Sequence, residues 1–103
     1  LFGVLLHITI YTFFKMIKAK VVKLQTLPDK DEKVMYVKSG DIFQGSFKHW
    51  PKIGESFVLW RGMSIELRTT EVKDVISDRE FKTLNSIYKI ITERDETIEF
   101  ILK

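Results

Sequence analysis

Few side chains in this sequence are suited to catalysis, and they lie far apart. Nucleophilic catalysis needs a nucleophile, a base within about 3 Å of it and usually a third group that orients the base. The chain has no cysteine and two histidines, of which His7 lies in an apolar leader and His49 in a loop beside Trp50. One credible histidine does not make a catalytic triad, and we predict that the protein is not an enzyme.

The acidic residues concentrate in segments that have the composition of turns. Acid–base catalysis places two carboxylates in a cleft, whereas carboxylates in turns are normally solvated. The acids concerned are Asp29, Asp31, Glu32, Asp41, Asp78, Glu80, Asp95 and Glu96. The two histidines lie far apart and there is no cysteine, so the sequence has no His/Cys cluster for a metal. The segment 28–32 lacks the ligand spacing of a calcium loop, and the five glycines are too scattered for a phosphate-binding loop. We therefore expect no metal and no cofactor.

The strongest candidate for a binding site is the loop around Trp50. A tryptophan in a basic, proline-containing loop is often exposed, and such residues anchor protein interfaces. We predict a protein partner that contacts Phe47, Lys48, His49, Trp50 and Lys52. The alternative partner is a single-stranded nucleic acid, because bases stack on aromatic rings while lysines contact phosphates. That interpretation uses Lys18, Lys20, Lys23, Lys48, Trp50 and Lys52. In a third interpretation, Trp50 folds back over an open barrel end.

Length and composition limit the architecture. At 103 residues the chain fits one domain. Hydrophobic residues make up 45% of it and charged residues 30%, which favours a folded core over a disordered chain. Residues 1–61 contain ten Lys or Arg against five Asp or Glu, whereas residues 62–103 contain seven against nine. The basic first part would suit a polyanionic partner, although a mixed surface with a net charge of +3 explains it equally.

The first fifteen residues form an apolar leader with two open interpretations. Leu1 to Phe14 is too short for a transmembrane helix, which needs about 20 apolar residues, and it lacks the charged start of a secretory signal. Either Met16 is the true start and residues 1–15 are upstream read-through, or the leader is a truncated membrane anchor. We expect a cytoplasmic protein, or else a membrane-anchored one whose domain faces the cytoplasm.

From residue 16 onward the pattern is strand and turn. Apolar and polar residues alternate over 17–25, with a change of face at Val21 and Val22 that predicts a bulge or a strand buried on both sides. We predict further strands over 34–37, 42–47, 57–60, 65–69 and 97–102. Turns are expected at 28–32, 39–41, 61–63 and 93–96, and a loop at 49–54.

The segment 77–92 fits two structures equally well. Ser77 and Glu80 have the spacing of a helix capping box, and Ile76 and Phe81 have that of a hydrophobic staple. The same segment is rich in threonine, serine and asparagine, which form helices poorly, and its second part alternates as a strand does. The residues alone leave helix and strand open.

Two segments carry a signature that resembles short, uncharacterised β-rich proteins of phages and mobile genetic elements. The signature consists of Ile65, Thr69, Thr70 and Val72, followed by Phe81, Thr83, Asn85, Ser86, Tyr88 and Ile90, and the approach to the preceding strand, Pro51 to Phe57, is similar as well. This chain departs from the pattern at Thr70, where serine is common, and at Glu71, where proline is common. The resemblance implies strands over 81–92 and a phage or plasmid origin, and it implies no activity.

We expect an all-β domain over 16–103, a small SH3-like or OB-like barrel of six or seven strands, with one short helix near 77–92 as the alternative for that segment. We expect the signature threonines, Asn85 and Ser86 to be structural, since hydroxyls pair across strands and the Asn85 amide can bond unpaired backbone groups at a bulge. The predicted function is that of a non-enzymatic protein-interaction module, an accessory protein of a phage or mobile element. The alternative is sequence-tolerant binding of single-stranded nucleic acid. Self-association is expected to use an exposed sheet edge.

Overall fold

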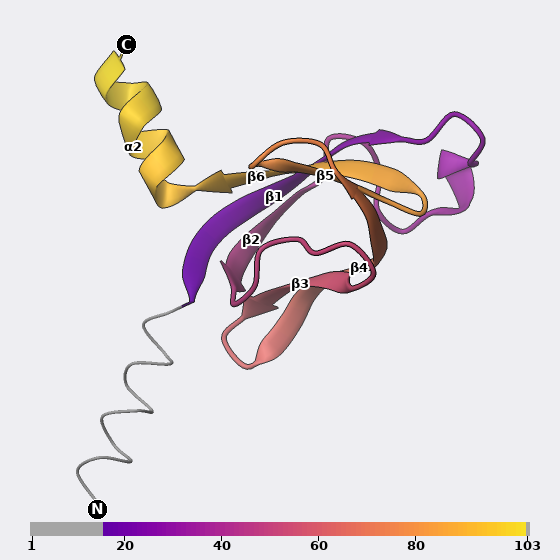
Figure 1. Ribbon diagram of the computed structural model, residues 1–103, viewed down its shortest axis with the longest axis horizontal. Helices are drawn as coiled ribbons and strands as arrows, with labels where there is room; N and C mark the ends of the chain where they lie inside the picture. Colours follow the sequence, from indigo (N-terminus) through magenta and orange to yellow (C-terminus); the bar gives the residue numbers. More distant parts are fainter. Residues whose placement is uncertain (1–15, 103) are drawn as a thin grey trace, which may run out of the picture.

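The computed structural model describes residues 16–102, which form one barrel followed by one helix (Figure 1). Our two interpretations of residues 1–15 lie outside the described residues. The strands are β1 (Ile17–Thr26), β2 (Ile42–Phe47), β3 (Ser56–Arg61), β4 (Ser64–Val75), β5 (Glu80–Thr83) and β6 (Ser86–Thr92), and the helices are η1 (Glu32–Val34) and α2 (Glu93–Leu102). Each strand pairs antiparallel with the next, and β6 pairs with β1, so the barrel is closed.

The prediction of a small all-β barrel with six or seven strands is confirmed, and the number is six. Strands that are neighbours in sequence are neighbours in the sheet throughout. This sequential order is that of an up-and-down barrel, whereas an OB fold needs the non-sequential order of a Greek key. The order of the strands therefore differs from that of an OB fold.

The barrel is filled by side chains from alternating strand positions. In β6, for example, Tyr88, Ile90 and Thr92 are buried, while Lys89 is exposed. A strand has a side-chain period of two, so every second residue points inward. The hydrophobic core comprises Ala19, Val21, Phe47, Phe57, Leu59, Leu67, Val72, Phe81, Tyr88 and Ile90.

Five aromatic rings form a continuous row through this core. Trp50 contacts Phe47 with ring centroids 4.8 Å apart, and Phe47 contacts Phe57 at 5.4 Å. Phe57 contacts Phe81 at 5.1 Å, and Phe81 is stacked on Tyr88 at 5.4 Å. These separations fall in the favourable range for aromatic pairs. The row connects the loop after β2 with Tyr88 in β6.

Close approach of β2 and β3 depends on Gly45. A Cβ atom built on Gly45 would lie 2.2 Å from the carbonyl oxygen of Trp60, which is shorter than any tolerated contact. The two strands pair at one position among the described residues, Ser46 with Trp60. Closure of the barrel pairs β1 with β6, so neither of these strands has the exposed edge that we expected. The short pairing between β2 and β3 is the weakest part of the sheet's hydrogen bonding.

The change of face predicted at Val21 and Val22 is wrong in detail. Burial continues inward through Ala19, Val21 and Lys23, and the register shifts only between Lys23 and Gln25. The bulge therefore lies after Lys23, and because the face does not change before it, Lys23 occupies an interior position.

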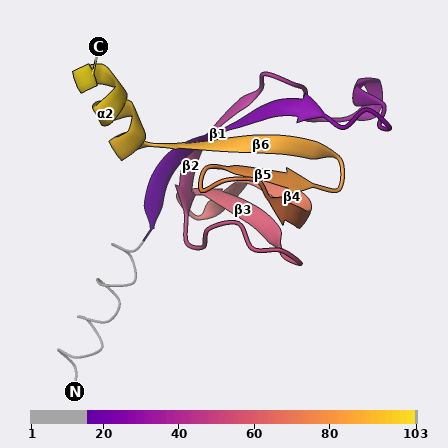
Figure 2. The ribbon, with the colours of Figure 1, turned by 45° about the horizontal axis from the view of Figure 1, so that its top comes forward.

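The strand predicted over 34–37 is also wrong. Residues Glu32–Val34 form a single 3-10 turn, and the segment between β1 and β2 is a loop that passes beyond the end of β1 (Figure 2). The carboxylate of Asp31 caps this turn by accepting a bond from the Lys33 N–H at 3.0 Å. The end of this loop is hydrogen-bonded to the backbone of Lys23. The Lys23 carbonyl accepts from the Gly40 N–H at 2.8 Å, and the Lys23 N–H donates to the Asp41 carbonyl at 3.0 Å.

Strands, not a helix, occupy the second part of 77–92, as the resemblance implied. The Ser77 hydroxyl does accept from the N–H of Glu80, at 3.2 Å, as it would in a capping box. However, the N–H groups of Ile76 and Ser77 both donate to the Glu80 carbonyl, which closes a β-turn instead. The helical alternative fails because β5 then pairs with β4 and β6, and Phe81 and Tyr88 enter the core.

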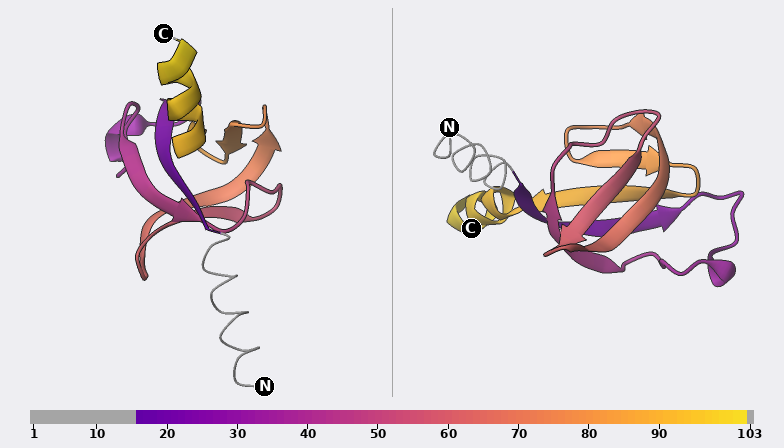
Figure 3. Two further views of the ribbon diagram at one scale, coloured as in Figure 1. Left: turned by 90° about the vertical axis from the view of Figure 1, so that its left-hand side faces the viewer. Right: turned by 90° about the horizontal axis from the view of Figure 1, so that it is seen from below.

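The turn and strand predicted over 93–102 are wrong, because α2 occupies this segment. Its start is a capping box that we missed: the Asp95 carboxylate accepts from the Thr92 N–H at 3.0 Å, and the Thr92 hydroxyl accepts from the Asp95 N–H at 3.2 Å. A seventh strand would need a partner, and β1 and β6 are already paired on both sides. The helix projects away from the barrel (Figure 3). Within residues 16–102, none of the helices has the length and apolarity to cross a bilayer.

Candidate binding surface around Trp50

Trp50 lies at one end of the barrel, in the loop that joins β2 to β3. Its side chain folds back so that the ring contacts Phe47 edge-on, yet 40% of the residue remains exposed. The guanidinium carbon of Arg79 lies 4.9 Å from the centre of the indole ring. A cation held over an aromatic face is attracted by the electron-rich ring. Trp50 is therefore both a plug of the barrel end and a half-exposed aromatic surface.

Arg79 is held in place by the start of α2. Its Nε donates to Oδ2 of Asp95 at 2.8 Å, and its second terminal nitrogen donates to Oδ1 at 3.2 Å. These hydrogen bonds lower the pKa of Asp95 to about 2 and raise the pKa of Arg79. A bidentate pair of this kind fixes orientation as well as distance. The capping box of α2 thereby positions the cation that covers Trp50.

Two hollows meet at Trp50. The first, of about 440 Å³, is lined by cationic residues of β1, the β4–β5 turn and α2, namely Lys18, Arg79 and Arg94, together with Glu93. The second, of about 220 Å³, is lined by the β2–β3 loop and one face of β3, and its charged residues are Lys48, Lys52 and Glu55. We call Trp50 together with the basic residues that line the two hollows the Trp50 surface; its members are Lys18, Lys48, His49, Trp50, Lys52, Arg79 and Arg94.

Most of the residues predicted from the sequence meet at this surface. Lys48, His49, Trp50 and Lys52 are exposed neighbours in the loop. Lys18 comes from β1 and lines the first hollow beside Trp50. The structure thus joins the protein-binding set and part of the nucleic-acid-binding set at one end of the barrel.

Two predicted residues are corrected and a third lies elsewhere. Phe47 is 0% exposed and belongs to the core, so it supports Trp50 from beneath and offers no surface to a partner. Lys23 is 1% exposed, because it points into the barrel at the opposite end of β1. Lys20 forms an ion pair with Glu96 of α2 at 2.9 Å.

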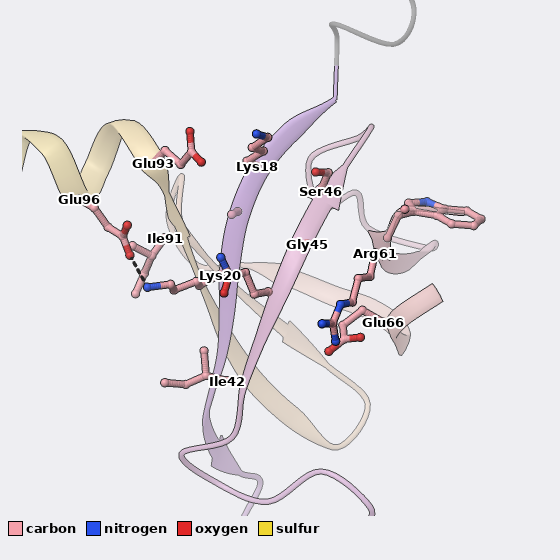
Figure 4. A pocket seen from close by; sticks show the side chains of 14 residues that line it. Lys18, Lys20, Ile42, Gly45, Ser46, Arg61, Glu66, Ile91, Glu93 and Glu96 are labelled. Atoms are coloured by element: carbon pink, nitrogen blue, oxygen red, sulfur yellow. Dashed lines mark ion pairs between the residues drawn. The ribbon is translucent and has the colours of Figure 1, made fainter. Parts of the chain in front are cut away.

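A third hollow near these residues lies outside the barrel wall, between α2 and the outer faces of β1 and β2 (Figure 4). It measures about 670 Å³, and its charged lining is mixed: the cations Lys18, Lys20 and Arg61 face the acids Glu66, Glu93 and Glu96. Figure 4 shows Lys20 and Glu96 joined across it. Three cations and three acids balance in its lining, so this hollow favours neither sign of ligand.

Sequence reasoning missed Arg79 and Arg94. Nothing in the local sequence links Arg79 to Trp50, since 29 positions separate them and only barrel closure brings them together. Arg94 was assigned to a turn, although the Thr92 and Asp95 spacing was a signal for a helix start. Within residues 16–102, we found no group of three or more His, Cys, Asp or Glu side chains arranged to hold a metal ion.

Comparisons of the chain with protein-family models, with curated proteins and with solved structures found no match. The candidate site therefore rests on its own geometry.

Proposed function

We propose that this domain is a non-enzymatic interaction module that binds an acidic segment of a protein partner at the Trp50 surface. The observation that carries the proposal is a half-exposed tryptophan with Arg79 over its ring and with Lys18 and Arg94 in the same hollow. Tryptophan and arginine are the residue types that most often dominate binding energy at protein interfaces. The surrounding cations would steer an acidic partner and favour it over a basic one.

The rigidity of this surface supports the proposal. Trp50 rests on Phe47, and Arg79 is held by two hydrogen bonds to Asp95. Side chains that are already ordered lose less entropy when a partner binds. The Trp50 surface is thus prepared to bind without rearrangement.

Binding of single-stranded nucleic acid is the second candidate, favoured by the same combination of an indole and nearby cations. It has less support, because a backbone-tracking groove needs a row of unpaired cations. Of the lysines assigned to that role, Lys23 is buried, Lys20 pairs with Glu96, and Lys52 lies 3.9 Å from Glu55. Glu93 also lines the first hollow and interrupts the row of cations that a nucleic-acid backbone would follow.

The wider setting is part of the same proposal. The resemblance of the Ile65–Val72 and Phe81–Ile90 segments supports an accessory protein of a phage or mobile element. Such a protein would meet its partner in the cytoplasm of the host cell.

A peptide-display selection tests the main candidate. Wild-type protein should enrich peptides that carry acidic residues beside an apolar or aromatic residue. Reversing the charge at Lys18 and Arg94 replaces attraction by repulsion at two exposed positions. Each change should weaken the binding free energy by up to about 1 kcal/mol. A Lys18→Glu/Arg94→Glu variant should therefore bind the selected peptides roughly tenfold more weakly.

The matched control changes the net charge equally at exposed positions away from Trp50. A Lys33→Glu/Lys89→Glu variant should bind the selected peptides as the wild type does. An equal loss of peptide affinity in both variants would show that the effect depends on overall charge alone, and it would contradict the proposal.

Fluorescence anisotropy with labelled oligonucleotides at two salt concentrations tests the second candidate, since phosphate contacts make affinity fall steeply with salt. Salt-sensitive oligonucleotide binding that Lys18→Glu/Arg94→Glu abolishes would establish the second candidate instead.

A further inference from the structure

The end of the barrel opposite Trp50 contains a separate hollow, built from the signature residues. Its volume is about 220 Å³. It is lined by the β1–β2 loop on one side and by the β4, β5 and β6 strands on the other; the residues from the signature are Thr69, Thr70, Thr83, Asn85, Ser86 and Tyr88. In Figure 1 this loop, with η1, lies at the far end of β1 from α2. Two segments that are separate in sequence thus converge on one small polar site.

Some of these groups are structural, as we predicted. The Thr83 hydroxyl bonds both the N–H and the carbonyl of Ser86, each at 3.2 Å, and so ties the β5–β6 turn. The Thr69 hydroxyl accepts from the Phe57 N–H at 3.0 Å and donates to the Thr70 carbonyl at 2.7 Å. Both hydroxyls are therefore committed to the backbone.

Other polar groups of the hollow are not committed. The Thr70 hydroxyl accepts from the Leu84 N–H at 3.2 Å, which leaves its own hydrogen available. Asn85 bonds Leu27 through its backbone carbonyl at 2.9 Å, and within the described chain its side-chain amide has no bond. These groups offer hydrogen-bond donors to a ligand.

Lys23 supplies a buried cation in the same hollow. Its ammonium donates to the Val37 carbonyl at 2.7 Å and lies 3.5 Å from Met35 Sδ. An ammonium has three N–H donors, so one remains after these two acceptors of the described chain. Burial lowers the pKa of Lys23, whereas Glu32 and Asp41 raise it and Lys38 lowers it. A buried ammonium is stabilised when an anion occupies the space beside it.

The acids closest to Lys23 are engaged by the loop itself. The Glu32 carboxylate accepts from the Ser39 N–H, and the Asp41 carboxylate accepts from the Lys38 N–H at 2.8 Å. None of the described residues that line the hollow is acidic, and Arg68 adds a second, exposed cation at its edge. The lining therefore carries positive charge and hydrogen-bond donors.

We propose that this hollow binds a small oxyanion, with Lys23 and Arg68 contacting its oxygens and with Thr70 and Asn85 donating hydrogen bonds. The group is carried either by a phosphate monoester or by the terminal carboxylate of a peptide. Pockets that enclose whole drug-sized ligands measure about 300–1,000 Å³, so a hollow of about 220 Å³ suits a single charged group or chain end. The site is independent of the Trp50 surface and lies at the other end of the barrel.

Amide chemical shifts followed during two titrations test the proposal. One probe is inorganic phosphate; the other is acetyl-diglycine with a free carboxylate, compared with its amide. Either anion should saturate shifts at Thr70, Thr83 and Ser86, and the amidated peptide should not. The anion that binds identifies the source of the oxyanion. The absence of saturable shifts at this end with both anions would overturn the proposal.

Variants separate a built site from general attraction by a basic protein. Arg68→Gln should weaken binding about tenfold, because a hydrogen bond to a charged group is lost. Arg61→Gln removes an exposed cation on the β3–β4 turn and should leave the affinity unchanged. Lys23→Met should abolish binding, and Arg68→Gln keeps the test valid if Lys23→Met does not fold. Equal affinity in Arg68→Gln and wild type would refute the assignment. Lys18→Glu should have no effect here, so this result is distinct from the test of the Trp50 surface.

Discussion

The ion pair between Arg79 and Asp95 should make the stability of this domain depend on pH in a narrow acidic range. The perturbation is Arg79→Gln, which removes both hydrogen bonds to the Asp95 carboxylate and the cation over Trp50. The size of the expected effect follows from the pKa of Asp95, which falls from its ordinary value of 3.8 to about 2.

That difference in pKa has a corresponding free energy. One pKa unit equals 1.36 kcal/mol, so the pair and its capping bonds favour the folded carboxylate by at most about 2 kcal/mol. The two side chains are 31% and 30% exposed, and solvent screening reduces the value to about 1 kcal/mol. The contact with Trp50 adds about 0.5–1 kcal/mol that does not depend on pH in this range.

The sign of the pH dependence is set by the lowered pKa. A carboxylate whose folded pKa is depressed stabilises the fold above its unfolded pKa, and this stabilisation is lost as the pH falls through the folded pKa. The wild type should therefore lose about 1 kcal/mol more than Arg79→Gln between pH 4 and pH 2. Near neutral pH the melting temperature of the variant should be lower than that of the wild type. This difference in melting temperature should shrink by roughly 4–8 °C in acid.

Thermal unfolding at a series of pH values measures this gap, with Asp95→Asn and the double variant completing a mutant cycle. The coupling between Arg79 and Asp95 should be present near neutral pH and absent at pH 2. A gap of constant size across the range would show that the ion pair does not stabilise the fold. In that case the start of α2 would not hold Arg79 in place over Trp50.

Two further substitutions test the barrel itself. Gly45→Ala should destabilise the domain by at least about 1–3 kcal/mol, because its Cβ would clash with the Trp60 carbonyl and overpacking destabilises by that order. The neighbouring Ser46→Ala variant is the control and should change the melting temperature little. An equal loss of stability in both variants would refute the close approach of β2 and β3. Thr83→Ala should lower stability by about 1–3 kcal/mol, since buried backbone groups lose their partner. Asn85→Ala should leave the melting temperature unchanged, and a large loss there would mean that its side chain is structural.

Much of the barrel was predictable from local pattern. Short apolar runs bounded by turn residues identified β2 and β3, and alternation of apolar and polar residues identified the first part of β4. Gly62, with a φ of +63°, marked the β3–β4 turn, where a left-handed residue is required. The loop around Trp50 was likewise readable from its proline, basic residues and tryptophan.

The errors arose where local and tertiary preferences conflict. Apolar residues around Met35 have the composition of a strand, but Lys23 binds the backbone of that loop. Residues 97–102 alternate as a strand would, yet barrel closure leaves no edge for them, and the Thr92 and Asp95 capping box starts a helix. Ser77 makes the bonds of a helix cap within a β-turn, so a single motif fits two structures.

The sequence by itself determined the all-β class, the positions of most turns and a basic loop bearing a tryptophan, because these follow from residue type and short-range spacing. Only the tertiary structure decided that Phe47 supports Trp50 from within, that Lys23 is interior, and that Arg79 reaches from the β4–β5 turn to cover the indole. Those placements depend on which strands close the barrel and in what register. Register is a property of the whole sheet, and no local window of sequence contains it.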